Sequence, residues 1–463
     1  MNIKGMVEHM RSDKSWRRAV LAGVLLIALG VPGGEAAEVE ITVWANADVN
    51  ERYRTEGIRL AAIVLNEELK IEGRDVQVTV KQQSWSGSGS WEKLKQAFAL
   101  AIESGKGPHI IVAGHEDIAV WGKAGLIQPI EELVDLESYP FNDVFPNLWP
   151  IMTWNGRIWG VPQDAESRPL FGWIPHLRAI GYSQTDIAAL PERIKRGEYT
   201  LTNVLQDAKK IQDAGLVKPG YGFYPRAGKG PDFWQFYVAN GGELVDRASG
   251  KLALDRAALL RYYTFFYDAV FKYGVTKKNH LGMSWDQWYS EVASGKAGIW
   301  HGGTWHYARY TRGEGLTDFF DKVMFALIPA GGAEGRATTL THPLVYLVSK
   351  RAQAQEAELS ARLITIVTEP RLNTLHALAS AHLGITRAQT QLDTYASDRW
   401  TAEATELLQS AFALPNNPDF GQFDQIVWKG LTAAWSGAAT PQQAVDTVVR
   451  EIRATMKDKV VIR

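Results

Sequence analysis

Cysteine is absent from the 463 residues of this chain. Its absence excludes disulfide bonds, thiol nucleophiles, thiolate metal ligands and a lipid anchor on an N-terminal cysteine. An excess of charge of either sign is absent as well, because 50 lysines and arginines oppose 51 aspartates and glutamates, for a net charge of −1. Nucleic acid is therefore not the expected partner, since it calls for a concentrated basic face.

Long apolar runs are rare. The most apolar stretch is "AVLAGVLLIALGV", residues 19–31, whereas a membrane-spanning helix needs roughly 20 apolar residues. The stretch follows the basic segment "KSWRR" and precedes small residues at Gly34 and Ala36, which is the pattern of a secretory signal peptide. We expect residues 1–36 to be removed, leaving an untethered periplasmic protein. An uncleaved anchor or a buried helix is the alternative.

The motifs of several common chemistries are missing too. The chain has no phosphate-binding G-x-x-x-x-G-K-[ST], no zinc-binding H-E-x-x-H and no G-x-S-x-G nucleophile elbow. His301, His306 and His342 do not have the spacing of a metal-binding motif. We therefore expect no metal and no cofactor.

Paired carboxylates leave one catalytic alternative open. Asp164 and Glu166 are two residues apart in "PQDAESR", so on a strand they share a face, and Glu116 is a third candidate. A glycosidase needs two carboxyl groups roughly 5–9.5 Å apart, a distance that a sequence does not fix. The alternative is a secreted glycosidase or lyase that uses these three residues.

Strand-like and helix-like segments alternate along the first third of the chain. Alternating apolar residues predict strands at 39–46 and 75–83, and a short apolar run predicts a buried strand at 109–114. Helical spacing predicts helices at 52–70 and 90–107. This order is typical of βαβ units with helices on both faces of a mostly parallel sheet. Ligands of such folds bind at the carboxyl ends of the strands.

The chain is too long for one ordinary core, so we expect two α/β lobes. Their predicted boundaries are residues 37–163 plus 345–385 for lobe 1 and 164–344 plus 386–463 for lobe 2.

Tryptophan is abundant, with 17 residues. Several lie at predicted strand ends or loop starts: Trp44, Trp85, Trp159, Trp234, Trp300 and Trp305. A flat ring with polar neighbours suits a sugar, because the ring packs on its C–H face while carboxylates and amides bind its hydroxyls. Each tryptophan taken alone is better explained as part of the core, and it is their repeated position at strand ends that favours a ligand site. In "AGIWHGGTWHYARY", residues 297–310, we expect Gly302 and Gly303 to allow a tight turn that projects Trp305 into a cleft.

Four stretches in order resemble the solute-binding proteins of bacterial ABC importers, in the carbohydrate-binding, maltose-binding-protein-like family. They are "ITVWAN", "GPHIIVAGHEDIAVWGKAGLIQPIEELV", "WNGRIWGVPQDAESRPLFGW" and "SGKAGIWHGGTW". The resemblance implies a two-lobed, type II-like periplasmic-binding fold with a multi-strand hinge that closes over its ligand. It also implies no catalysis, a monomer, and a membrane permease as the partner.

Carried onto this sequence, the resemblance implies a pocket built from several loops. Trp305 would be the stacking platform, and the segment 232–234 and the late loop around Phe423 would face the ligand. Arg168 would either bind an anionic group or pair with Glu166. The full predicted ligand-binding set is Trp44, Asn46, Asp48, Trp85, His115, Glu116, Asp164, Glu166, Arg168, Trp234, Gly303, Trp305, His342 and Phe423.

The sequence departs from the family pattern at two places. His109 replaces the usual acid of the strand motif, and Gly172 and Trp173 replace a usual Tyr-Asn pair. The ligand therefore stays open between a neutral oligosaccharide, a polyol and a sugar with an anionic group. A third class of function is an exported adaptor whose aromatic surface binds protein.

Overall fold

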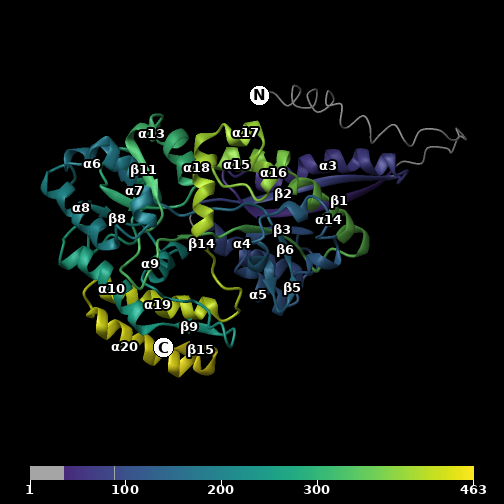
Figure 1. Ribbon diagram of the computed structural model, residues 1–463. Helices are drawn as coiled ribbons and strands as arrows, with labels where there is room; N and C mark the ends of the chain where they lie inside the picture. Colours follow the sequence, from purple (N-terminus) through teal and green to yellow (C-terminus); the bar gives the residue numbers. More distant parts are fainter. Residues whose placement is uncertain (1–35, 88) are drawn as a thin grey trace, which may run out of the picture. The chain divides into compact units, whose positions relative to one another are not determined.

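Five strands form the larger sheet, in the order β2-β1-β3-β13-β6. They are β1 (Ala37–Asn46), β2 (Val76–Trp85), β3 (Ile110–Gly114), β6 (Gly160–Pro162) and β13 (Leu344–Val348). β1 and β3 run parallel, whereas β13 runs antiparallel to both β3 and β6. This arrangement is seen in the computed structural model of the protein (Figure 1). The structure describes residues 36–87 and 89–463. All of the predicted signal peptide except Ala36 lies outside these residues.

Helices cover this sheet because their apolar residues recur at helical spacing. In α3 (Tyr53–Ile71), Ile58 and Leu65 are fully buried, and the helix packs on β2 and on α14 (Ala354–Thr368). The other helices of this part are α4 (Ser90–Glu103), α5 (Asp117–Lys123) and α15 (Pro370–Ser380).

A second sheet has the order β11-β7-β10-β8. Its strands are β7 (Leu170–Trp173), β8 (Phe223–Tyr224), β10 (Ile299–His301) and β11 (Val323–Ala326). β10 is parallel to β8, and β7 is antiparallel to both β10 and β11. The predicted α/β class is confirmed, but both sheets are mixed rather than mostly parallel. The chain crosses between them after β6 and returns at β13, so the returning strand enters the first sheet in the opposite direction.

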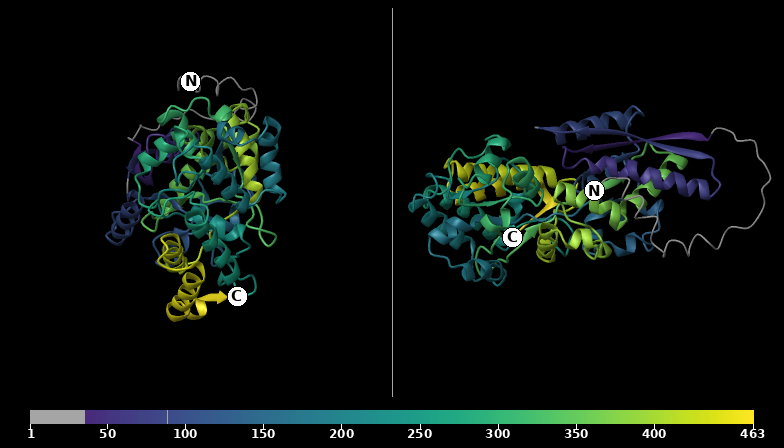
Figure 2. Two further views of the ribbon diagram at one scale, coloured as in Figure 1. Left: turned by 90° about the vertical axis from the view of Figure 1, so that its left-hand side faces the viewer. Right: turned by 90° about the horizontal axis from the view of Figure 1, so that it is seen from above.

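The helices around the second sheet are mostly short. They are α6 (Ile174–Ala179), α7 (Gln184–Lys195), α8 (Leu201–Asp213), α9 (Trp234–Ala239), α10 (Arg256–Phe271), α11 (Trp285–Ala293), α12 (His306–Ala308) and α13 (Phe319–Lys322). The C-terminal part adds α16 (Arg387–Thr390), α17 (Asp393–Ala396), α18 (Arg399–Glu406), α19 (Phe420–Trp435) and α20 (Pro441–Thr455). α19 and α20 pack on each other and on α10. Both are drawn in yellow in Figure 2.

Short elements complete the connections. Three strand pairs are β4 (Thr153–Trp154) with β5 (Arg157–Ile158), β9 (Leu252–Leu254) with β15 (Val460–Ile462), and β12 (Thr339–Leu340) with β14 (Ala411–Phe412). Single helical turns are η1 (Ile130–Glu132), η2 (Phe141–Asp143), η3 (Trp149–Met152), η4 (Pro231–Phe233), η5 (Arg309–Gly313), η6 (Leu407–Ser410) and η7 (Lys457–Lys459). None of the helices in the described ranges is long and apolar enough to cross a membrane.

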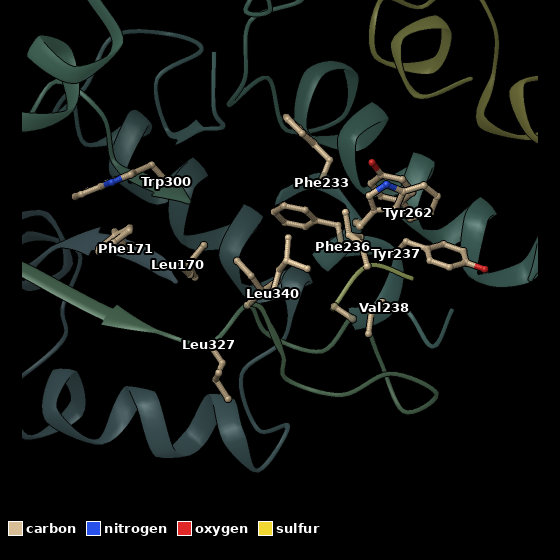
Figure 3. Packing of buried hydrophobic residues seen from close by; sticks show 14 of the residues in the cluster. Leu170, Phe171, Phe233, Phe236, Tyr237, Val238, Tyr262, Trp300, Leu327 and Leu340 are labelled. Carbon is tan, nitrogen blue, oxygen red and sulfur yellow. The ribbon is translucent and has the colours of Figure 1, made fainter. Parts of the chain in front are cut away.

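Aromatic rings fill the core of the second sheet. Trp300 is fully buried, stacks on Phe171 at 5.5 Å between ring centroids, and donates from Nε1 to the hydroxyl of buried Tyr310 at 3.1 Å. Phe233 and Phe236 extend the same core toward α10 (Figure 3). Half of the aromatic residues in the segment 297–310 are therefore core residues.

A glycine in β6 marks a close contact between strands that can be tested. A Cβ atom on Gly160 would lie 2.4 Å from Val345 Cγ1 and 2.7 Å from the Tyr346 carbonyl oxygen of β13. We expect Gly160→Ala to lower the free energy of unfolding in urea by about 1–3 kcal/mol, because the strands must separate. Gly421→Ala is the control, since a Cβ there meets no atom within 4 Å. Equal stability of the two variants would contradict this packing.

Candidate ligand-binding site

The ends of β1 and β2 and the loop after β1 carry the first predicted residues. Trp44 and Trp85, near the ends of β1 and β2, contact each other at 5.0 Å between ring centroids. Asn46 is buried, and its Nδ2 donates to Ser90 Oγ at 2.5 Å. Asp48 is exposed, and its carboxylate accepts backbone N–H groups of its own loop. The ends of β1 and β2 therefore bring together two aromatic rings and a buried amide group, and the loop after β1 adds the exposed carboxylate of Asp48.

A second group gathers around Glu116, just after β3. Its Oε1 lies 3.1 Å from Lys95 Nζ, and its Oε2 lies 2.9 Å from His342 Nε2. Burial alone would raise the pKa of Glu116, but Lys95 and His342 outweigh it and hold that pKa well below its ordinary value. The carboxylate folds back over Gly114, where a Cβ would come within 2.1 Å of it. The structure thus brings Glu116 and His342 together, although 225 residues separate them.

A third group centres on Asp232 in η4. Arg168 Nη1 lies 2.7 Å from Asp232 Oδ2, and Arg226 pairs with the same oxygen. Arg168 also pairs with Glu166, which follows the crossing from the first sheet. Asp232 is fully buried, yet the two guanidinium groups outweigh its desolvation and lower the pKa of its carboxyl group far below the ordinary value.

Trp305 lies directly over this third group. The guanidinium carbon of Arg168 is 4.9 Å from its ring centroid, and that of Arg226 is 5.6 Å away. The imidazole of His382 stacks on the indole at 5.6 Å with an interplanar angle of 12°. The ring remains partly exposed. Cations over an indole face are attracted by its quadrupole, so the protein itself holds the ring in place.

The glycines before Trp305 provide space for the side chains that follow the turn. Neither Gly302 nor Gly303 has a positive φ. A Cβ on Gly303 would lie 1.9 Å from Trp305 Cζ3, and one on Gly302 would lie 2.3 Å from His306 Nδ1. The backbone does turn here, since the N–H of His306 donates to the carbonyl oxygen of Gly303 at 3.1 Å, but the turn does not depend on a positive φ. The two glycines allow the two rings that follow to fold back onto the backbone.

Asp164 is fully engaged by neighbours within the protein. Its Oδ2 lies 3.1 Å from His376 Nε2 and 3.9 Å from Arg54 Nη2, and its Oδ1 accepts the backbone N–H of Leu344 at 3.0 Å. Burial would raise the pKa of Asp164, but His382, His376 and Arg54 lower it to about 2. Its oxygens therefore hold the crossing between the sheets to α3 and α15.

Two predicted residues pack on each other. Trp234 and Phe423 stack at 5.4 Å with an interplanar angle of 15°, and both are buried. Trp234 Nε1 donates to Asp424 Oδ1 at 2.9 Å. These contacts place the two rings in the hydrophobic core, where α9 meets α19.

Sequence reasoning missed the residues that hold the site together. Arg54, Arg226, His376 and His382 were not among the predicted residues, and each acts through a partner distant in the chain. Arg54 and His382, for example, are 328 positions apart. A lone arginine in an amphipathic helix carries no local signal of such a role.

Two hollows lie elsewhere on the protein. One, of about 420 Å³, is lined by residues that include Phe145, Tyr395 and Gln409. The other, of about 560 Å³, is lined by Arg256, Arg453 and neighbours on α20. None of the predicted ligand-binding residues lines either one.

The arrangement of strands and connections is that of the periplasmic binding proteins. The maltose-bound MalE3 of T. maritima matches with a TM-score of 0.72 at 18% identity, over 90% of this chain and 100% of that chain. A solute-binding protein of Thermotoga lettingae bound with tagatose matches with a TM-score of 0.70 at 19% identity, over 90% and 99%. The sugar-binding protein MalE of Xanthomonas citri matches with a TM-score of 0.69 at 19% identity, over 90% and 97%.

Residues 62–358 match the family model described as bacterial extracellular solute-binding protein. Because this is more than half of the chain, the protein belongs to that family. As a member of that family it is a solute-binding receptor and not an enzyme. The glycosidase or lyase alternative is thereby set aside.

His301, at the end of β10, contacts Arg226 of the site and the aromatic core next to it. Its Nε2 accepts the backbone N–H of Arg226 at 3.3 Å, and its ring lies 5.0 Å from Phe236 and 5.4 Å from Phe233 between centroids. Burial lowers the pKa of His301 to about 3; Asp232 opposes this, while Arg226, His280 and Arg168 add to it. The folded protein therefore keeps this imidazole neutral.

This buried imidazole predicts a pH dependence of stability. The unfolded chain binds a proton at His301 below about pH 6.5, so acidification favours unfolding until the pH reaches the lower folded pKa. We expect His301→Gln to reduce the slope of unfolding free energy against pH by about 1.4 kcal/mol per unit between about pH 6 and pH 4. Urea unfolding at several pH values measures it. Equal slopes in wild type and variant would contradict a neutral His301.

Proposed function

We propose that this receptor captures a carbohydrate or related polyol in a cleft between two lobes and delivers it to a membrane permease. The observation that carries the proposal is Trp305, a partly exposed indole in the turn between β10 and α12 that lies beside ion-paired arginines and carboxylates. A sugar uses both features, since its C–H face packs on an aromatic ring while its hydroxyls take hydrogen bonds.

The two lobes of the proposal follow the two sheets. Lobe 1 consists of residues 37–163 plus 345–385 and contains the first sheet, except that β13 begins one residue earlier. Lobe 2 consists of residues 164–344 plus 386–463 and contains the second. Hinge closure of such lobes around a ligand is an established mode of motion in periplasmic binding proteins.

Buried polar atoms near the strand ends support a hydroxylated ligand. Trp44 Nε1, Thr304 Oγ1, Thr341 Oγ1 and Asp232 Oδ1 are buried without a hydrogen-bond partner in the described chain. Such atoms are costly to leave unpaired. A sugar hydroxyl is both donor and acceptor, so one ligand class can satisfy an indole N–H and a carboxylate oxygen alike.

The charges favour a neutral ligand over an anionic one. Arg168 faces Glu166 and Asp232 at once, and Arg226 shares Asp232 with it. The positive charge of Arg168 is therefore already compensated by two carboxylates. An anionic sugar would have to displace one of these buried pairs. The similar solved structures bound with maltose and tagatose support the same choice.

The adaptor alternative receives less support. A protein-binding aromatic surface needs several exposed rings side by side. Among the described residues, the aromatic rings that are largely exposed are Tyr139 and Phe271, which lie on different elements. In this proposal the protein is a periplasmic monomer, and it binds the permease after its own two lobes have closed over the ligand.

A binding screen followed by one substitution tests the proposed function. Residues 37–463 are screened by thermal shift against neutral sugars, polyols and charged sugar derivatives. A ligand at 100 times its Kd stabilises the fold by about 2.7 kcal/mol. We expect a shift with a neutral sugar, recovered chemically unchanged, and at least a tenfold loss of affinity in Trp305→Ala, about 1.4 kcal/mol or more.

Phe271→Ala is the matched control, because this ring is exposed on α10. Its affinity for the sugar should equal that of the wild type. A folded Trp305→Ala variant with unchanged affinity, measured by titration calorimetry, would remove Trp305 from the site. The absence of any shift across the panel would contradict carbohydrate binding.

A further inference from the structure

Two histidines and a carboxylate converge beside β3 without a role that sugar binding requires. One ring nitrogen each of His115 and His342 and one carboxylate oxygen of Glu116 lie within 4.8 Å of one another. His115 and Glu116 come from the loop after β3, and His342 comes from the connection between β12 and β13. Two imidazoles with one carboxylate form a donor set that zinc and similar divalent ions prefer.

One ring nitrogen of His115 has no hydrogen-bond partner in the described chain. It is fully buried, and its Nε2 lies 3.2 Å from the carbonyl oxygen of Leu414. With the Nε2 proton donated to that carbonyl, Nδ1 carries the lone pair, and Nδ1 is buried without a hydrogen-bond partner in the described chain. A second-shell carbonyl that fixes the tautomer of a ligating imidazole is a regular feature of metal sites.

Glu116 is held in position from its other side. Lys95 binds Oε1 at 3.1 Å and leaves Oε2 directed at His342, 2.9 Å from Nε2. Lys95 also lies 2.8 Å from Asp117. The ammonium group is thus shared between two carboxylates, so the cluster retains an attraction for a cation.

A second cluster of two histidines and one carboxylate has no such room for a cation. Asp164, His376 and His382 also bring three ligand atoms within 4.8 Å. Arg54 Nη2, however, lies 3.4 Å from His382 Nε2 and 3.9 Å from Asp164 Oδ2. The guanidinium group occupies the place that a cation would take. The structure therefore distinguishes the two clusters, and the second serves as an internal control.

We propose that His115, Glu116 and His342 bind one divalent transition-metal ion of the zinc type. The ion ties the loop after β3 to the connection that precedes β13 and leaves a coordination position for water or a ligand oxygen. Metal binding at this site does not require a bound sugar, so it can be tested independently of the proposed carbohydrate binding.

The test is a zinc titration of residues 37–463, free of any histidine tag and freed of metal by a chelator, with no sugar present. Calorimetry should show one ion per chain. His342→Gln and Glu116→Gln should each weaken binding at least tenfold, whereas His376→Gln, from the control cluster, should bind as the wild type does. Circular dichroism and thermal melts without metal confirm that each variant is folded.

Cobalt(II) provides a spectroscopic readout of the same site. Bound to imidazole and carboxylate, it should give visible absorption that saturates at one equivalent and is absent in His342→Gln. No saturable uptake of zinc by the wild type would overturn the proposal. So would equal uptake by wild type and both the His342→Gln and Glu116→Gln variants, or a loss confined to His376→Gln. If His342→Gln does not fold, Glu116→Gln decides.

Discussion

The buried carboxylate of Asp232 is the constraint on which the candidate site depends. It is fully buried and shared by two arginines that arrive from different parts of the chain, Arg168 after the crossing and Arg226 after β8. An unpaired charge in such surroundings is strongly destabilising, so the three groups stay together. Their pairing fixes both guanidinium groups over Trp305 and positions Glu166 beside them.

The aromatic core makes this charged layer rigid. Phe233, the neighbour of Asp232 in η4, packs against His301, whose Nε2 accepts the N–H of Arg226. Close packing of large rings leaves little room for alternative rotamers. The two tryptophans of this segment thus have different roles: Trp300 stabilises the core, and Trp305 is partly exposed above it. The same segment supplies both because a strand end passes directly from core to surface.

Much of the fold could be predicted from the sequence, because strand and helix periodicities are local signals. The alternating residues of 39–46 became β1, the short apolar run at 109–114 became β3, and four short motifs indicated the family. The mixed direction of the sheets was not predictable in this way, since strand direction is set by where the chain crosses and returns. β13 pairs with β3 across more than 200 residues.

The site was less predictable for a related reason. Which strand end a residue follows can be read from the sequence, and this placed Glu116, Glu166 and Trp305 among the candidates. Whether its side chain is free cannot be read there. Asp164 is engaged by Arg54 and His376, and Trp234 stacks on Phe423, because of contacts that only the fold creates. Buried ion pairs between distant segments leave no pattern in either segment.

Hydrogen exchange measured by mass spectrometry, with and without a saturating sugar, tests most directly whether the strand ends around Trp305 form the ligand site. The sugar should slow exchange in residues 44–48, 163–169 and 302–310 and leave α20 unchanged. Protection confined to other segments, such as those lining the hollow at Phe145 and Tyr395, would contradict the account.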